Sequence, residues 1–478
     1  MLFNSLHFLA FFPVVLGIYF ALPHAARWAW LLVASCYFYA AFIPAYLLIL
    51  FVLIGVDYAA GIAIADAQGA RRKAFLVLSL LANVGMLAFF KYYNFFAANL
   101  TALGHGVGLP LSARTLGIVL PIGLSFHTFQ SMSYTIEVYR GAQRAERHLG
   151  IYALYVLFWP QLVAGPIERP QNLLHQFREP KRFEPRRASQ GAELMVLGFA
   201  KKVLVADTLA RTVNAVYASP ESSSGLSLLV AAYFFAFQIY YDFSGYSDIA
   251  RGASKIMGFE LMVNFDRPYV STSISEFWRR WHISLSTWFR DYLFIPLGGS
   301  RISRARTALN LLLVFLVSGF WHGANWTFLA WGALHGSALV VSTLLFGERR
   351  KAAPATALRR ALKVFVTFHF VTLAWVFFRA ETMTKALYVL SHLFTRNGAS
   401  TWAALPESRP HLLLCVAALV AVESLETWIR ARHRAAPTPD RSLFAAGLRY
   451  AVALGILILV LFRLTDDRAP QQFIYFQF

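Results

Sequence analysis

The sequence predicts an all-α polytopic membrane protein, and three observations support this fold class. Of the 478 residues, 58% are apolar and only 14% are charged, whereas a soluble domain carries about a quarter charged residues. The mean hydropathy is +0.52. The apolar residues gather in stretches close to the ~20 residues that a helix needs to cross a bilayer. Such a chain cannot cover a globular surface with polar groups, which excludes soluble and disordered proteins.

Most of the chain divides into apolar stretches that are candidate membrane spans, and we expect about 11 to 12 transmembrane helices. The candidate spans are residues 5–22, 28–43, 45–65, 74–97, 115–138, 190–207, 226–250, 307–320, 324–346, 362–379, 411–429 and 443–464. Residues 149–166 are also apolar, but they contain Pro160, Gly165 and Pro166 between basic flanks. This pattern favours a re-entrant or interfacial segment over a span.

The net charge of +20 comes from 44 Lys and Arg against 24 Asp and Glu. The basic residues form short clusters between the apolar stretches, at Arg71 to Lys73, Arg140 to Arg147, Arg169 to Arg187, Arg301 to Arg306, Glu348 to Arg360 and Arg430 to Arg441. This is the distribution that the positive-inside rule predicts for cytoplasmic loops. We therefore expect membrane lipid as the partner of these charges and no nucleic acid. With these clusters in the cytoplasm, both chain ends lie on the opposite side.

The two cysteines, Cys36 and Cys415, lie in apolar runs, so the sequence predicts no redox or metal site.

One apolar stretch ends in a polar motif. Residues 307–320 form a helix of only about 20 Å, against a hydrocarbon core of about 30 Å. They run directly into Trp321, His322, Gly323, Ala324, Asn325 and Trp326. A turn at that depth needs partners for its backbone groups. His322 therefore lies either at the floor of a cavity or in a hydrogen bond that anchors a kink.

Residues 271–299 have a different pattern. Ser273 and Glu276 predict a capping box, and an apolar stripe follows at Phe277, Trp281, Leu285, Trp288 and Phe289. The remaining face carries polar residues that include Arg279, so we expect an amphipathic helix at the interface or along a cavity. His282 borders the stripe, and it is either an anchor at the level of the lipid headgroups or a catalytic group.

Two further segments carry polar or aromatic residues where they are unusual. Asp242 and Asp248 lie in the apolar stretch 226–250, and acids inside a membrane are functional candidates. The alternative is that they pair with arginines such as Arg251, Arg279 or Arg280, which we favour for Asp248. The end of the chain, residues 471–478, carries four aromatics in its last six residues. It should dock into an apolar groove or the bilayer edge, or act as an interfacial anchor.

Residues 120–126, 241–248, 276–299 and 321–325 together resemble the membrane-bound O-acyltransferase family. The match is closest to the alginate O-acetylase branch, which includes peptidoglycan O-acetyltransferases. The resemblance implies one domain over residues 1–478, a helical bundle around a central tunnel. Its core lies at about residues 115–346. Residues 465–478 form an extracytoplasmic tail.

The resemblance also implies the chemistry. His322 matches the family's central catalytic histidine, and His282 its second, more variable one. Tyr475 matches a tail tyrosine that is implicated as a transient acyl carrier. We expect acetyl-CoA as a cytosolic donor substrate, no bound cofactor, and transfer across the bacterial cytoplasmic membrane. An extracytoplasmic partner protein then passes the acetyl group to an exported polysaccharide. Weaker candidates for contact with substrate or donor are Asn325, Trp321, Asp242 and Arg279.

Three alternatives remain open at this point. The acceptor is peptidoglycan instead of an alginate-type polysaccharide, with the same chemistry. A protein of another class, a transporter or flippase for a lipid-linked sugar, would use Asp242, Asp248 and the arginines as its pathway and would tolerate loss of Tyr475. A scaffold for other enzymes would need neither histidine.

Overall fold

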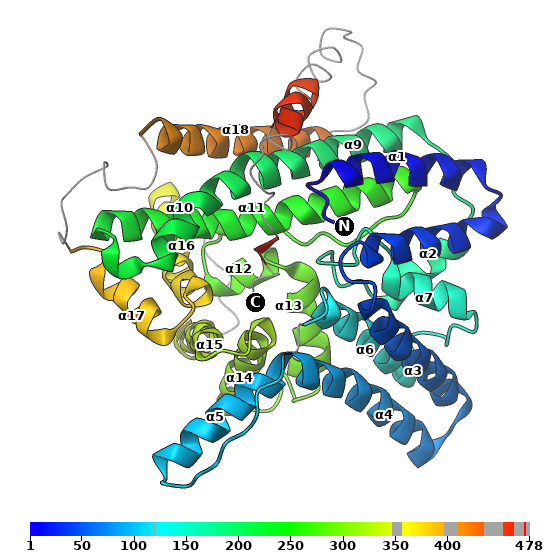
Figure 1. Cartoon of the computed structure of the whole chain (residues 1–478), viewed down its shortest axis with the longest axis horizontal. Helices are drawn as coiled ribbons and strands as arrows, with labels where there is room; N and C mark the ends of the chain where they lie inside the picture. Colours follow the sequence, from blue (N-terminus) through cyan, green and yellow to red (C-terminus); the bar gives the residue numbers. More distant parts are fainter. Residues whose placement is uncertain (118–119, 347–355, 396–408, 435–452, 463–472, 475–478) are drawn as a thin grey trace.

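The computed structural model describes residues 1–117, 120–346, 356–395, 409–434, 453–462 and 473–474, and every regular element in these residues is helical (Figure 1). The predicted fold class is confirmed. The main helices are α1 Leu6–Ala21, α2 His24–Ala40, α3 Tyr46–Asp66, α4 Gly69–Leu87, α5 Tyr93–Gly106, α6 Leu124–Arg140, α7 Leu149–Leu157, α8 Pro170–Leu173, α9 Pro185–Phe199, α10 Asp207–Ala218, α11 Gly225–Met257, α12 Ile274–Arg280, α13 Ile283–Phe289, α14 Arg304–His322, α15 Trp326–Phe346, α16 Ala357–Arg379, α17 Met383–His392 and α18 Arg409–Arg434. Three π-helical turns extend helices, η1 Ala88–Tyr92, η3 Ala200–Ala206 and η6 Arg290–Phe294.

Within the described residues, six helices are long and apolar enough to cross a membrane, which is fewer than the predicted spans. They are 46–66, 69–106, 225–257, 304–322, 326–345 and 357–379, and two shorter apolar helices lie at Leu6–Ala21 and Ala453–Phe462. Two of the predicted spans fall short for a visible reason. The stretch 115–138 becomes α6, which starts only at Leu124 and is rich in buried polar side chains. The stretch 190–207 combines the end of α9 with η3, which carries two buried lysines.

The stretch 149–166 behaves as predicted, because it does not form a spanning helix. Helix α7 is nine residues long, and the turns from Phe158 to Pro166 are buried in the protein. Irregular backbone at such a place has its polar groups satisfied by surrounding protein.

Helices α9 and α11 pack closely along their length and lie beside α1 (Figure 1). Glycines face each other at two levels of this contact. A Cβ atom at Gly198 would lie 2.6 Å from the carbonyl oxygen of Gly245, and one at Gly191 would lie 2.6 Å from that of Gly252. Small residues of this kind let two helix backbones approach. The contact brings η3, which continues α9, against the carboxylates of α11.

The predicted amphipathic helix over residues 271–299 is wrong in one respect, because it is broken in two at His282. His282 has a φ of +43°, a conformation that is uncommon for a residue with a side chain. Asn264 explains the break: its carbonyl accepts the backbone N–H of Ile283 at 2.9 Å, and its Oδ1 accepts that of Ser284 at 3.2 Å. The predicted start is confirmed, since the Ser273 hydroxyl accepts the backbone N–H of Glu276 at 3.2 Å.

The prediction that residues 307–320 form too short a span is also wrong. Helix α14 has 19 residues, or about 28 Å at 1.5 Å per residue. The Ser303 hydroxyl caps it, so it begins at Arg304 and takes in the basic residues before the apolar stretch. The predicted break after His322 is confirmed, because α14 ends there and α15 begins at Trp326.

Candidate active site

The two predicted histidines come together in the interior. His322 is the last residue of α14 and His282 joins α12 to α13, and their side chains are 5% and 0% exposed. The two imidazoles are close enough to interact electrostatically. The ring of Phe126 contacts both sides of the site: it lies 6.1 Å from the ring of His282 and 5.6 Å from the ring of Trp321, the neighbour of His322. The interpretation of His282 as an anchor at headgroup level is therefore wrong.

Aromatic rings surround both imidazoles. The ring centroids of Trp321, Trp331 and Phe378 lie 4.8, 5.1 and 5.2 Å from that of His322. His282, which lies outside the spanning helices, has no hydrogen-bond partner for either ring nitrogen among the described residues. Burial lowers the pKa of His282 to about 3, so its imidazole is neutral at neutral pH. A neutral imidazole can accept a proton or donate a hydrogen bond.

Lys91 fixes the end of α14, and sequence reasoning missed it. It lies in η1, within the long helix 69–106, and its Nζ donates to the carbonyl oxygens of Trp321 at 2.7 Å and His322 at 2.8 Å. The last carbonyls of a helix have no partner within the helix and carry partial negative charge. The lysine therefore holds the turn that carries His322. Its signal in the sequence is a single charge inside an apolar stretch, which is costly in a membrane.

The turn after His322 is held from the other side as well. Asn325 Nδ2 donates to the carbonyl oxygen of Glu381 at 2.8 Å, and its Oδ1 accepts the backbone N–H of Thr327 at 3.2 Å. This half-buried side chain thus ties the turn to the start of α15 and to the α16–α17 junction. Trp321, another of the predicted contact residues, is buried and stacks on the ring of Phe129 at 5.0 Å.

A cavity of about 440 Å³ lies beside the histidines, between α12, α13 and η6 on one side and α14 and α15 on the other. Its polar lining comes from Arg279, Arg290, Ser275, Ser286, Thr287 and Ser318. Both arginines are exposed. The lining residue Ile283 follows His282 in the chain, and Ser318 lies one helical turn before His322. The cavity therefore has an exposed, basic rim and reaches residues that are neighbours of the two histidines in the chain, while neither histidine itself lines it.

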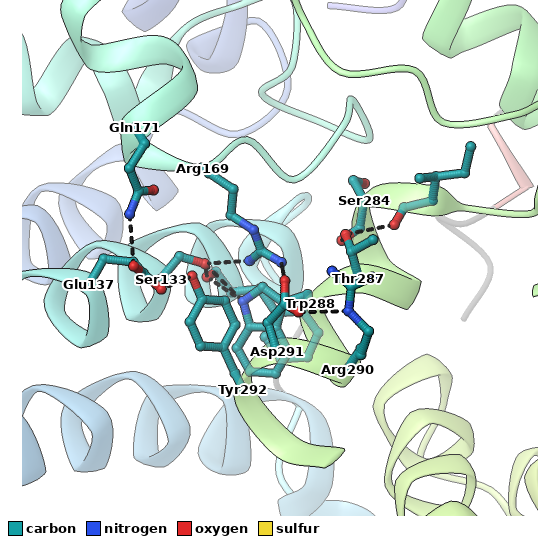
Figure 2. A network of polar contacts seen from close by, with 12 residues as sticks. Ser133, Glu137, Arg169, Gln171, Ser284, Thr287, Trp288, Arg290, Asp291 and Tyr292 are labelled. Carbon is teal, nitrogen blue, oxygen red and sulfur yellow. Dashed lines mark hydrogen bonds and ion pairs between the residues drawn. The ribbon is translucent and has the colours of Figure 1, made fainter. Parts of the chain in front are cut away.

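A polar network anchors η6 and the adjoining part of α13 to α6 (Figure 2). Arg169 donates to the Ser133 hydroxyl at 3.2 Å and pairs with Asp291 at 3.4 Å. The Tyr292 hydroxyl donates to Glu137 at 2.8 Å, and the guanidinium of Arg169 lies 4.6 Å from the Tyr292 ring. These contacts hold α13 and η6 in place, and other residues of the same two elements line the cavity.

The carboxylates of α11 are paired with buried lysines of η3, which the sequence reasoning also missed. Asp242 pairs with Lys202 at 2.7 Å, and Asp248 pairs with Lys201 at 2.7 Å. Asp248 also contacts Arg251 at 3.6 Å, as predicted. The partner of Asp242 is a lysine and not an arginine.

The predicted acyl carrier, Tyr475, lies outside the described residues. The two residues before it are described, and Phe473 and Ile474 are 2% and 1% exposed. The ring of Phe473 lies 5.7 Å from that of Phe243 in α11. This part of the chain end therefore docks inside the protein, which confirms the predicted apolar groove for these two residues.

Comparison with known proteins decides the family. The family model of MBOAT, the membrane-bound O-acyltransferase family, matches residues 140–381. A probable alginate O-acetylase AlgI of Azotobacter vinelandii is 41% identical over 400 residues, which are 83% of this chain and 78% of that protein. The chain belongs to the membrane-bound O-acyltransferase family. It is an acyltransferase of the membrane, and the matched residues include both histidines, Arg279 and Asp242.

Two further relatives are named for other transfer reactions. The peptidoglycan O-acetyltransferase of Helicobacter pylori is 36% identical over 433 residues, 84% of this chain and 81% of that protein. The teichoic acid D-alanyltransferase of Streptococcus thermophilus is 32% identical over 281 residues, 54% of this chain and 68% of that protein.

Proposed function

We propose that this MBOAT protein passes acetyl groups from cytosolic acetyl-CoA across the bacterial cytoplasmic membrane for O-acetylation of an exported, alginate-type polysaccharide. The observation that carries the proposal is the pair of buried histidines beside a cavity with a basic rim. The names of two relatives support acetyl as the group, and that of the Azotobacter relative names alginate. Peptidoglycan, named for the Helicobacter relative, is the alternative acceptor.

The cavity suits a donor that carries phosphates at one end and a thioester at the other. Arg279 has no ion-pair partner among the residues that the structure describes, and Arg290 beside it contacts only its neighbour Asp291 there. Guanidinium groups bind phosphate oxygens with paired hydrogen bonds. The volume of about 440 Å³ lies in the range of small-molecule sites. Acetyl-CoA is a substrate in this proposal, and no bound cofactor is needed.

The step at the histidines is an acyl transfer. A tyrosine hydroxyl has a pKa of about 10, so it attacks poorly until a base takes its proton. His322 removes the proton from the Tyr475 hydroxyl while the oxygen attacks the thioester carbonyl carbon. The carbon–sulfur bond then breaks, O-acetyl-tyrosine forms, and the imidazolium returns the proton to the CoA thiolate. In this step the neutral His282 donates a hydrogen bond to the carbonyl oxygen.

An extracytoplasmic partner protein completes the reaction by moving the acetyl group from Tyr475 to a polysaccharide hydroxyl. One ester is exchanged for another in this second step, so it needs no further donor. The division lets the charged CoA stay on its own side of the membrane.

The test is the mass of the C-terminal peptide after purified protein is incubated with acetyl-CoA. We expect one acetyl group on Tyr475 in the wild type, and a rate about 10²- to 10⁴-fold lower in His322→Ala. His105→Ala, at an exposed histidine of α5, is the matched control and should match the wild type. Full acetylation of the polymer in cells that carry His322→Ala would show that the assigned base is wrong. An unmodified tail in a protein that still consumes acetyl-CoA would exclude the relay and leave the donor in place.

The acceptor is decided separately in cells. O-acetyl esters are quantified in the exported polysaccharide and in peptidoglycan, with and without the intact chain. Loss from peptidoglycan alone would assign the alternative acceptor.

A further inference from the structure

We propose that Asp242 is a positioning residue that docks the C-terminal segment inside the bundle through the backbone N–H of Ile474. The docking itself concerns described residues only. Its purpose, to place the next residue, Tyr475, for acyl transfer, rests on the proposed function.

The decisive contact is a hydrogen bond between a backbone amide and a buried carboxylate that also belongs to an ion pair. The N–H of Ile474 donates to Oδ2 of Asp242 at 2.7 Å. The other oxygen of Asp242 pairs with Lys202 Nζ at 2.7 Å, and Lys202 also contacts Asp207 at 2.8 Å. Hydrogen bonds with an ionised partner are roughly twice as strong as neutral ones. Asp242 is 2% exposed, so both contacts are shielded from solvent.

Aromatic packing fixes the direction of the docked segment. The ring of Phe473 lies 5.2 Å from that of Tyr246 and 5.7 Å from that of Phe243. Phe243 in turn lies 4.6 Å from the ring of His282. The docked segment therefore joins the aromatic wall of the histidine site. In Figure 1 it is the short dark red piece beside α11.

The start of the chain supports the same dock. The ring of Phe3 stacks on that of Tyr246 at 4.5 Å, and Asn4 Nδ2 lies 3.5 Å from Oδ2 of Asp207. Residues from the beginning, middle and end of the sequence thus meet around Lys202 and its two carboxylate partners. Buried ion pairs add little stability compared with apolar packing. We therefore attribute to the ion pairs of Lys202 a role in specifying where the segment at residues 473–474 binds.

Docking at Ile474 should lower the entropic cost of acyl transfer to a carrier at the next position. In the proposal, an anchored Ile474 removes conformational freedom from the segment just before the carrier, since consecutive Cα atoms are only about 3.8 Å apart. A free tail would have to lose that freedom in every transfer, and restricting a reactant in advance lowers the barrier.

The first measurement is hydrogen exchange of the purified full-length protein, read by mass spectrometry on C-terminal peptides. The Ile474 amide should exchange slowly in the wild type and at least 10-fold faster in Asp242→Asn. Asp66→Asn is the control, because Asp66 pairs with Arg147 at the surface, and it should leave the exchange unchanged. Exchange of the wild-type amide at the rate of an unprotected peptide would overturn the docking.

The second measurement separates positioning from general damage. Ile474→Pro removes the N–H donor and leaves the ion pair intact, so it carries the test even where Asp242→Asn does not fold. Ile474→Val keeps the donor and is its control. We expect Ile474→Pro to lower kcat for transfer from acetyl-CoA at least 10-fold without changing KM, and Ile474→Val to match the wild type. Equal kcat in the two variants would overturn the positioning role.

The two failures are distinguishable. Full activity of His322→Ala would remove the proposed function, while the exchange of the Ile474 amide would still decide whether Asp242 docks the tail.

Discussion

Replacing Lys91 by methionine tests how His322 is held. Lys91 Nζ donates to two carbonyl oxygens at the end of α14, at 2.7 and 2.8 Å. Methionine has a similar length and no donor, so both carbonyls lose their charged partner. A hydrogen bond to a charged group contributes about 1.5–3 kcal/mol. If one or both bonds serve to hold His322 in its reactive position, transfer should slow by about 10- to 100-fold, since 1.4 kcal/mol corresponds to a factor of about 10.

The assay is the initial rate of acetyl transfer from acetyl-CoA by purified protein, corrected for the monodisperse fraction after size exclusion. Lys91 does not line the cavity, so the loss should fall on kcat and leave KM for acetyl-CoA unchanged. Lys91→Arg keeps a charged donor and should lose less. A Lys91→Met protein with the wild-type kcat, or one that differs only in KM, would refute this account of the α14 terminus.

Three further perturbations follow from the packing and the charges. Gly332→Ala places a Cβ 2.3 Å from a carbonyl oxygen of α14, so it should lower the melting temperature in detergent by the equivalent of about 1–3 kcal/mol; Gly55→Ala, with nothing within 4 Å, should not. Burial lowers the pKa of His282 to about 3, against about 6.5 in the unfolded chain. As the pH falls from 6.5 toward 3, the unfolded chain therefore binds a proton at this residue that the folded protein does not, and the free energy of unfolding decreases. Melting curves between pH 4 and 8 should therefore show a steeper acid decline for the wild type than for His282→Gln. Tyr292→Phe loses the 2.8 Å bond to Glu137 and should cost about 1–3 kcal/mol in the same melting assay, whereas an unchanged melting temperature would show that the network does not anchor η6.

The helical fold and the end of a helix near His322 could be predicted because they follow from local patterns. Apolar stretches of spanning length formed helices, and the polar motif after residue 320 ended one of them at His322. The break at His282 could not be predicted from the same pattern. It depends on Asn264, which lies in a loop and supplies acceptors for the first amides of α13, and nothing in the apolar stripe reveals that contact.

The three lysines with internal partners were missed for a different reason. Lys91, Lys201 and Lys202 lie in stretches that are apolar on average, and averaging hides a single charge. Their partners are backbone carbonyls in one case and distant carboxylates in the others. A charge inside an apolar stretch is itself a signal that such a partner exists, although the sequence does not say which one.

Read together, the lysine contacts divide the task of positioning between two reactants. Lys91 holds the turn that carries the proposed base, His322, and Lys202 holds the carboxylate that binds the segment before the proposed carrier. Each lysine has its charge taken up by polar groups other than the reacting ones, so the imidazoles remain in aromatic surroundings. A neutral histidine can take the proton of an attacking hydroxyl. In the proposed mechanism the lysines therefore act by geometry, and the histidines are neutral before the transfer begins.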